Sequence, residues 1–414
     1  MTPRPRTSAQ PPPGPLAGLR VIDCSTVLAG PLCTMILGDL GASVIKVEPP
    51  EGDATRGWGP PWVAAPGVER VAAYYLSVNR NKRSLRLDLA TDAGRAVLGD
   101  LLRTADAVVE NQRVGGFERL GFSEARLAEL NPALVHLAIS GYGPTGPSAA
   151  KPGYDFVIQA AAGLMSITGR PDADGGRPTK VGVAISDVVT GLFGAIGLLG
   201  ALMARHAGAA QGQRVDVSIL ESTLAVLVNQ AHNAFATGRA PARLGNAHPN
   251  IVPYETFATS DGEIAVAVGS ERQWPRLCAT LGLPELAMET RFADNDGRVR
   301  HRDELRPILA ERFASRTSAA WLEALDASAI PAGPINDVLA AFADPQAQAR
   351  EMTVDVEHPA FGKLRQVGLP ITLSATPASI RAAPPRLGEH STEILQELGY
   401  DDGTIARLVA DGVV

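Results

Sequence analysis

Asp187 is the residue with the clearest capacity for chemistry. It closes a short β-branched run, residues 180–186, and opens an almost uncharged segment that stays apolar as far as Met203. A segment that is apolar on every face is typical of a buried helix. We therefore expect Asp187 at the start of a core helix, where free backbone N–H groups favour the ionised carboxylate. In the simpler alternative, Ser186 or Asp187 only caps that helix.

Further polar residues follow a strand predicted at residues 107–109. Asn111, Gln112 and Arg113 come almost directly after it, and Arg119 follows a few residues later. In open α/β sheets, ligands gather at the carboxyl ends of the strands. These four side chains are therefore candidates for polar contacts with a ligand, and ordinary loop polarity explains them equally well.

Two more groups of charged residues allow a binding and a structural interpretation. The cations of residues 80–86 either enter a solvated strand or hold a phosphorylated ligand; they are Arg80, Lys82, Arg83 and Arg86. Asp155, next to Tyr154, lies in the first turn of a predicted helix, where capping is its simplest role.

The elements that position these residues begin with a βαβ unit. Strands are predicted at residues 19–23 and 43–48, with a helix over 32–40 between them. Pro31 suits the first helical position, and the corner at Gly30 leads into a helix N-terminus that attracts phosphate or carboxylate. Because Gly30 is the only glycine of a G-x-G-x-x-G loop here, NAD binding is disfavoured.

Strands and helices continue to alternate along the first half of the chain. Strands are expected at 84–89, 107–109, 134–140, before Asp187 and at 214–217, and helices at 92–103, 155–164, 188–203 and 220–236. This alternation predicts an α/β fold, a parallel sheet with helices on both sides.

The pattern changes after about residue 238. Residues 254–268 read as a hairpin around Asp261-Gly262. Helical patterns at 271–281, 302–313 and 318–325 follow, so this part predicts a smaller α+β domain. Strands at 354–357 and 362–367 and helices near 393–398 and 403–409 end the sequence.

Composition narrows the class of protein. The net charge of −6 argues against nucleic acid as a partner. Cys24, Cys33 and Cys278 form neither a metal spacing nor a disulfide framework, so a reducing, cytoplasmic location is expected. The apolar run 188–203 is shorter than a membrane span and contains glycines, so we expect no membrane segment. Residues 1–15 lack the apolar core of a signal peptide and predict a disordered tail.

These landmarks resemble the family III CoA-transferases, the group that includes formyl-CoA transferase and the carnitine CoA-transferases. The resemblance rests on residues 16–31, 37–48, 81–84 with 109–111, and 152–155, and extends over nearly all the chain after the tail. It implies an acyl-CoA thioester and a carboxylic acid as substrates, with no metal and no permanently bound cofactor. It also implies an interlocked homodimer with a Rossmann-like large domain made of both chain ends.

The implied domain boundaries are a large Rossmann-like, CoA-binding domain over 16–220, a linker helix over 221–250, a small α+β domain over 251–330, and a linker returning to the large domain over 331–414. The resemblance places the family's nucleophile on Asp187. It places CoA-binding positions on Val27, Leu28, Ala29, Leu87, Asn111, Gln112, Arg113, Arg119, Tyr154 and Asp155.

Two departures bear on the substrate. Leu28 stands where formyl-CoA transferase has a glutamine, and residues 250–263 lack that enzyme's glycine-rich lid. Tyr154 stands where the family's 2-methylacyl-CoA racemases have a histidine, and α-proton exchange needs a second acid/base there. Tyr154 with residues 163–169 is more similar to transferases that use succinyl-CoA and dicarboxylate acceptors.

The sequence therefore predicts a CoA-transferase that acts on succinyl-CoA or another short dicarboxylyl-CoA through an aspartyl anhydride and an aspartyl-CoA thioester. Arg56, Arg239 and Arg243 are candidates to bind the second carboxylate. A 2-methylacyl-CoA racemase and a non-catalytic acyl-CoA-binding protein remain the alternatives.

Overall fold

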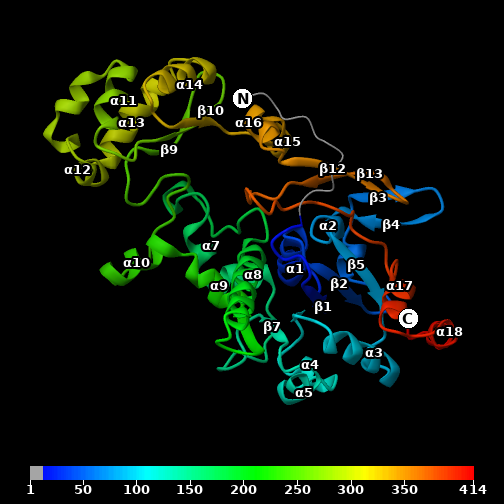
Figure 1. Ribbon diagram of the computed structural model, residues 1–414. Helices are drawn as coiled ribbons and strands as arrows, with labels where there is room; N and C mark the ends of the chain where they lie inside the picture. The colour runs from blue at the N-terminus through cyan, green and yellow to red at the C-terminus, as the bar shows by residue number, and fades with distance from the viewer. Residues whose placement is uncertain (1–12) are drawn as a thin grey trace. The chain divides into compact units, whose positions relative to one another are not determined.

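The computed structural model describes residues 13–414, so most of the tail expected over residues 1–15 lies outside the described residues. The described chain divides into two compact units. Unit 1 contains residues up to 164 together with 181–229 and 346–414, and unit 2 contains residues 165–180 and 230–345 (Figure 1). Unit 1 is therefore assembled from distant parts of the sequence.

Unit 1 is built on a parallel sheet of six strands. Their order is β5 (Lys82–Arg86), β2 (Ser43–Glu48), β1 (Arg20–Asp23), β6 (Ala107–Glu110), β7 (Val135–Ser140) and β8 (Gln213–Ser218). The chain first builds outward from β1 through β2 to β5, and then returns to place β6 on the other side of β1. The strand order reverses between β1 and β6, which is where open α/β sheets form a ligand crevice.

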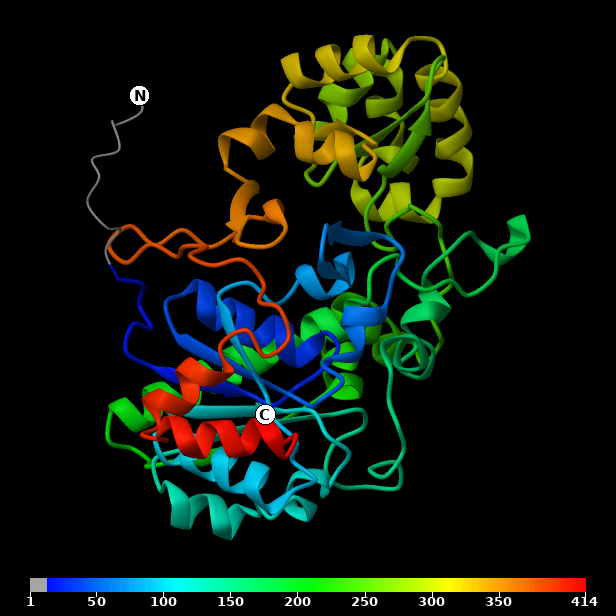
Figure 2. The same cartoon turned by 90° about the vertical axis from the view of Figure 1, so that its right-hand side faces the viewer.

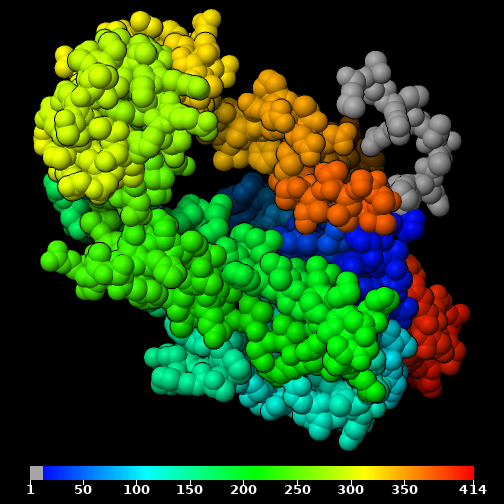
Figure 3. Space-filling model, turned by 60° about the vertical axis from the view of Figure 1, so that its left-hand side comes forward, coloured from blue at the N-terminus to red at the C-terminus, as the bar shows by residue number. Residues whose placement is uncertain are grey.

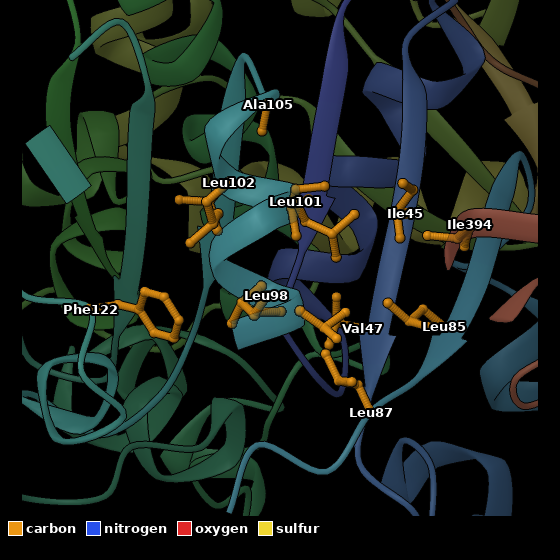
Figure 4. Packing of buried hydrophobic residues seen from close by; sticks show 14 of the residues in the cluster. Ile45, Val47, Leu85, Leu87, Leu98, Leu101, Leu102, Ala105, Phe122 and Ile394 are labelled. Carbon is orange, nitrogen blue, oxygen red and sulfur yellow. The ribbon is translucent and has the colours of Figure 1, made fainter. Parts of the chain in front are cut away.

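Helices cover both faces of this sheet because its strands are apolar on both sides. Val21 and Val44 face the helices α1 (Ala29–Asp39) and α8 (Ile185–His206). Their neighbours Ile22 and Ile45 point the opposite way, into a second cluster with α3 (Asp92–Arg103). Figure 4 shows Leu98 and Leu101 of α3 on the side of the helix that faces Val47 and Ile45 of β2.

The end of the chain completes the second face. Ile394 of α17 (Ser391–Glu397) and Ile405 of α18 (Asp402–Ala410) are buried in the same cluster as α3 and α5 (Glu124–Leu130). Asp88 N donates a 2.8 Å hydrogen bond to the carbonyl of Val413. In Figure 2 the red helices α17 and α18 lie beside the cyan segment that carries α3. The last residues are thus part of the sheet-bearing unit.

Two hairpins complete unit 1. β3 (Trp62–Ala65) pairs with β4 (Val68–Ala72), and the short helix α2 (Ala73–Leu76) follows directly. β12 (Thr353–His358) pairs with β13 (Gly362–Val367). Leu364 packs with Val71 and Tyr75 in one small apolar cluster, so the two hairpin regions share a core.

Unit 2 has a small antiparallel sheet and its own core. β9 (Tyr254–Ala258), β10 (Glu263–Ala267) and β11 (Ala332–Pro334) form the sheet, and the turn between the first two contains Asp261-Gly262 as expected. The core helices are α11 (Gln273–Leu281), α13 (Arg302–Phe313) and α14 (Ser318–Ala327). Trp274, Phe313 and Trp321 are fully buried among them.

Two predicted elements are wrong. Residues 180–184 form no strand, and Val181 N donates a 2.9 Å hydrogen bond to the side chain of Gln159 instead of to a strand. The helix expected over 220–236 is two helices, α9 (Ile219–Ala225) and α10 (Val228–Thr237). Val228 has φ 42°, and a residue with positive φ cannot continue a right-handed helix.

The helix α8 is not buried all round, contrary to the sequence prediction. Leu198 and Leu202 pack against the sheet, whereas Ile196 and Met203 are 64% and 65% exposed. In length and composition α8 would suit a membrane span, a property that core helices of soluble proteins share. Figure 3 shows the green surface of this part of unit 1 open to view.

Candidate active site

A cavity of about 200 Å³ lies at the crevice between β1 and β6. It is lined by the turn after β1, the loop after β6, the loop after β7, and one residue each from α8 and α9. The predicted site residues among its walls are Val27, Leu28, Ala29, Asn111, Gln112, Arg113, Tyr154 and Asp187. Pockets that enclose a whole drug-sized ligand measure roughly 300–1,000 Å³, so this cavity is smaller than such a pocket.

Asp187 lies in the first turn of α8 and does not cap it. The N-cap residue is Ala184, and no side chain caps the helix from that position. Ser186 N instead donates a 2.8 Å hydrogen bond to Oδ1 of Asp155, which comes from α6 (Asp155–Ala161). Asp155 thus satisfies one of the free N–H groups of α8. The capping alternative for Ser186 and Asp187 is therefore wrong.

The carboxylate of Asp187 is the free group of the site. Within residues 13–414 it has no hydrogen bond and no ion pair, and it is partly buried. Burial and the negative charge of Asp155 raise the pKa of Asp187 to about 7. The helix N-terminus was expected to keep this group ionised, but burial outweighs that effect. Asp187 is therefore poised near neutral pH, where a nucleophile or general base works best.

Asp155 joins the two helix starts and does not line the cavity. Its Oδ2 accepts a 2.8 Å hydrogen bond from Nε2 of Gln159, and Oε1 of Gln159 accepts one of 2.9 Å from Val181 N. The segment leading into α8 is therefore held by α6. Tyr154, just before α6, is 65% exposed and forms part of the cavity wall.

Asn111 lines the cavity, but both ends of its side-chain amide bind the protein itself. Oδ1 accepts a 2.9 Å hydrogen bond from Thr26 N, and Nδ2 donates one of 2.7 Å to the Thr26 carbonyl. Gln112 and Arg113 follow on the cavity wall, and Gln112 N is held by Oε2 of Glu110 at 2.7 Å. The predicted ligand contacts of all three side chains stay predictions, and among residues 13–414 Asn111 keeps one free N–H on the cavity wall.

Leu87 and Arg119 lie outside the walls of this cavity. Leu87 is 0% exposed and its side chain points into the core beside Val47 (Figure 4), while its N–H donates a 2.7 Å hydrogen bond to the Glu48 carbonyl. Arg119 ends the short helix α4 (Gly116–Arg119) and is exposed, with Nη1 lying over Gly115. Its predicted contact with CoA stays a prediction.

The basic cluster of residues 80–86 is structural. Arg80 pairs with Asp39 (2.6 Å) and Lys82 with Asp23 (2.9 Å), and all four groups are buried. Arg83 binds the exposed Glu393 and Glu397, and Nε of Arg86 donates to the Pro50 carbonyl. Arg80 and Lys82 are therefore not free to hold a phosphorylated ligand.

Of the arginines considered for a second carboxylate, Arg56 and Arg243 already have acidic partners. Arg56 forms two hydrogen bonds to Glu48, of 2.7 and 2.8 Å. Arg243, in unit 2, pairs with Asp172 of the same unit. Arg239, also in unit 2, has no ion pair within the described part of the chain.

Tyr74 is a candidate that the sequence did not single out. It lies on α2, and burial, followed by the charges of Asp187 and Asp155, raises its pKa to about 12. The hydroxyl therefore stays protonated and can donate a hydrogen bond. Trp58 packs edge-on against it, with ring centroids 5.4 Å apart. The Tyr74-Tyr75 pair gave no signal, because only the β3–β4 hairpin brings Tyr74 close to α8.

The geometry defines the class of protein. A half-buried carboxylate without a partner faces a cavity at the switch point of a parallel α/β sheet, which suits covalent catalysis by an aspartate. Among residues 13–414, no group of three histidine, cysteine or acidic side chains is arranged to hold a metal ion.

The chain belongs to CoA-transferase family III. The model of that family matches residues 16–391, which covers nearly all of the described chain. The protein is therefore a CoA-transferase, and the expectation drawn from its sequence motifs is confirmed.

Individual relatives are similar over almost their full length. The chain is 45% identical to the succinate–glutarate CoA-transferase of Agrobacterium fabrum over 93% of this chain and 96% of the relative. It is 40% identical to human succinyl-CoA:glutarate CoA-transferase over 97% and 90%. A solved CAIB/BAIF family protein from Brucella suis superposes with a TM-score of 0.81 at 42% identity, over 93% of this chain and 100% of that one.

Proposed function

We propose that this enzyme transfers CoA from succinyl-CoA or another short dicarboxylyl-CoA to a carboxylic acid, with Asp187 carrying the acyl group. The observation that carries the proposal is the carboxylate of Asp187, half-buried at the cavity and without a partner among residues 13–414. The names of the relatives from Agrobacterium fabrum and human support a dicarboxylyl donor.

In the first half-reaction, an oxygen of ionised Asp187 attacks the thioester carbonyl carbon of the donor. The carbon–sulfur bond breaks, CoA leaves as a thiolate, and an acyl-aspartyl anhydride remains. The thiolate then attacks the Asp187 carbonyl carbon of this anhydride. The donor acid leaves as a carboxylate, and an aspartyl-CoA thioester is formed.

In the second half-reaction, the acceptor carboxylate attacks the Asp187 carbonyl of the thioester and again releases the thiolate. The thiolate then attacks the acceptor's carbonyl carbon in the new anhydride, so the product acyl-CoA forms and Asp187 is regenerated as a carboxylate. No proton and no hydride is transferred. The chemistry needs an ionised aspartate, a dry cavity and donors for the negative charge that develops on oxygen.

The site contains groups suited to these needs. Asp187 is ionised at and above neutral pH, and its burial favours the uncharged anhydride and thioester forms. Gln112 and Arg113 on the cavity wall can bind the polar part of the substrate.

The test of the nucleophile is the variant Asp187→Asn, assayed with succinyl-CoA and a panel of carboxylic acids by mass spectrometry. We expect the transfer rate to fall by roughly a thousandfold or more, because an amide cannot form the anhydride. Asp174→Asn is the control, since Asp174 is exposed in unit 2 and lies outside the cavity. Wild-type turnover in Asp187→Asn would refute the mechanism.

Trapping gives a second, independent measurement. Hydroxylamine converts an anhydride or thioester on Asp187 into a hydroxamate, and borohydride reduces the thioester. Either modification is expected on the peptide that contains residue 187, only when acyl-CoA is present. Uptake of deuterium at the α-carbon of a 2-methylacyl-CoA without any acceptor would instead indicate a racemase.

A homodimer is part of the proposal. Large apolar side chains are exposed on α6 and α8 of unit 1: Phe156, Val157, Leu192, Phe193, Ile196 and Met203. Apolar patches of this kind on a soluble protein mark association surfaces. We propose that a second copy of the chain covers them.

A further inference from the structure

The turn after β1 is held by side chains at every polar backbone atom of two consecutive residues. Ser25 N donates to Oδ1 of Asp23 at 3.0 Å, and the Ser25 carbonyl accepts from Nζ of Lys46 at 2.8 Å. Thr26 N and the Thr26 carbonyl bind the two ends of the Asn111 amide at 2.9 and 2.7 Å. Turn residues usually satisfy these groups with water or with nearby backbone. Here four hydrogen bonds to side chains fix the Ser25–Thr26 backbone, and we call this set of bonds the clamp.

The clamp is anchored in the sheet. Asp23, Ser25 and Lys46 are fully buried, and Lys46 pairs with Asp53 at 2.9 Å. Its side chains come from the end of β1, from β2 and from just after β6, three neighbouring strands. A side chain held in a packed sheet has little freedom to move, so the positions of Ser25 and Thr26 follow from the sheet itself.

The next residue shows what the clamp imposes. Val27 has φ 72°, a left-handed conformation that is unfavourable for a β-branched residue. Such strain persists only where surrounding contacts enforce it, and it concentrates at functional sites. Gly30 completes the fit, because a Cβ there would lie 2.2 Å from Oγ of Ser25.

The strained residue lies on the wall of the active-site cavity. Val27, Leu28 and Ala29 line it together with Asp187. A shift of Thr26 would therefore move this wall relative to the carboxylate. Displacement of a reacting group by about 1 Å costs as much as roughly a hundredfold in rate.

We propose that Asn111 is a positioning residue that, with Lys46 and Asp23, fixes the Ser25–Thr26 backbone and thereby sets the Val27–Ala29 wall against the thioester. Asn111 acts on the reaction through this turn, since both ends of its amide are hydrogen-bonded to the Thr26 backbone. The inference rests on the proposed function for the rate it affects, and its structural part stands without that function.

The experiment compares Asn111→Ala and the near-isosteric Asn111→Asp with wild type, using three measurements. They are hydrogen exchange of the peptide covering residues 25–30, the dissociation constant of free CoA, and the rate constant of thiol release from succinyl-CoA in a single turnover. Gln112→Ala is the matched control for exchange, because it removes the neighbouring amide on the same cavity wall. A peptide from α3 reports whether the fold is intact.

In Asn111→Ala we expect exchange of the Thr26 amide to rise at least roughly tenfold, while α3 and the Gln112→Ala control stay protected at wild-type levels. Thiol release should slow at least roughly tenfold, with a change in CoA affinity below about threefold. Asn111→Asp keeps the acceptor for Thr26 N but loses the donor to the Thr26 carbonyl. Its rate of thiol release should therefore lie between those of Asn111→Ala and wild type.

Two results would overturn the inference. A loss of CoA affinity as large as the loss of rate would mean that Asn111 binds the ligand directly. Unchanged exchange over residues 25–30 in both variants would mean that the amide does not hold the turn. Failure of the proposed function would give a different result. Wild type would bind CoA and exchange would still be faster in Asn111→Ala than in wild type, but wild type would release no thiol from succinyl-CoA.

Discussion

At Asp187, burial and a neighbouring carboxylate act in the same direction. Both disfavour the charged form, which is why the pKa rises from 3.8 to about 7. A more basic carboxylate is a stronger nucleophile but stays protonated, and so inactive, up to a higher pH. A pKa near neutrality balances these two effects.

The rate of thiol release should therefore follow the ionisation of Asp187. We expect an acidic limb with a midpoint near pH 7, below which the rate falls about tenfold per pH unit. In Asp155→Asn the limb should move to lower pH, because one of the two causes of the raised pKa is removed while burial remains. Single-turnover rates between about pH 5 and 9 give the midpoint. An identical midpoint in both proteins would contradict this electrostatic account.

The same shift predicts an effect on stability. Between about pH 4 and 7 the folded state holds a proton on Asp187 that the unfolded state has lost, so this group's contribution to stability falls as pH rises through that window. Asp187→Asn removes the buried charge. Its melting temperature should exceed that of wild type by a few degrees at pH 8 and match it near pH 4. Asp174→Asn, on the surface, should match wild type at both values.

A residue's role could be predicted from the sequence where it depends on neighbouring residues in the chain, and not where it depends on contacts with distant ones. Asp187 was singled out because its place before an apolar segment is a local pattern, and the family resemblance alone assigned it the role of nucleophile. The type of Asn111 was noticed, but its role depends on Thr26, which is 85 positions away and meets it only across the β1–β6 crevice. Tyr74 was missed for the same reason, since its closeness to α8 follows from a hairpin whose placement is not local.

At the scale of elements, buried ion pairs tie the strands β1, β2 and β5 together. Lys82 on β5 reaches Asp23 at the end of β1, and Nζ also donates to the Pro31 carbonyl and to Asn79. Burial alone would raise the pKa of Asp23, but Lys82 and Lys46 outweigh it and hold that pKa below its usual value. The buried Asp23 thus stays ionised because Lys82 and Lys46 lie close to it.

Removing one member should be costly. We expect Lys82→Met to destabilise the fold by about 3–5 kcal/mol, because it leaves a buried carboxylate without its partner. Arg83→Met is the comparison, since its partners Glu393 and Glu397 have side chains 57% and 39% exposed, and exposed pairs contribute about 0–1 kcal/mol. Urea unfolding of both variants measures the difference. Equal losses of unfolding free energy in the two variants would show that burial of the ion pair does not determine its contribution to stability.

The parallel strands could be predicted because fully buried strands form continuous β-branched and aliphatic runs. The run at residues 180–186 has the same composition, yet it forms no strand, and Val181 N binds the side chain of Gln159. Composition reports what a segment is able to form. Which segments pair as strands depends on the relative stability of all possible pairings, and this cannot be read from the sequence of one segment.

At the scale of the whole molecule, the first two-thirds of the sheet-bearing unit followed from the alternation of strands and helices. The return of the chain end to this unit was expected from the family resemblance alone, because the patterns of helices α17 and α18 would suit either unit. The buried contacts of Ile394 and Ile405 place these helices in the core of the sheet-bearing unit.

The exposed apolar face of unit 1 leads to the last prediction. Leu192, Ile196 and Met203 are 45%, 64% and 65% exposed, and their spacing of four and seven places them on one stripe of α8. If a second copy covers this stripe, sedimentation will give twice the chain mass of 43.3 kDa. Ile196→Asp should yield the monomer, because burying an unpaired carboxylate there opposes association. Met288→Asp, at an 85% exposed residue of unit 2, should stay dimeric. A monomeric wild-type protein would mean that the stripe has another role.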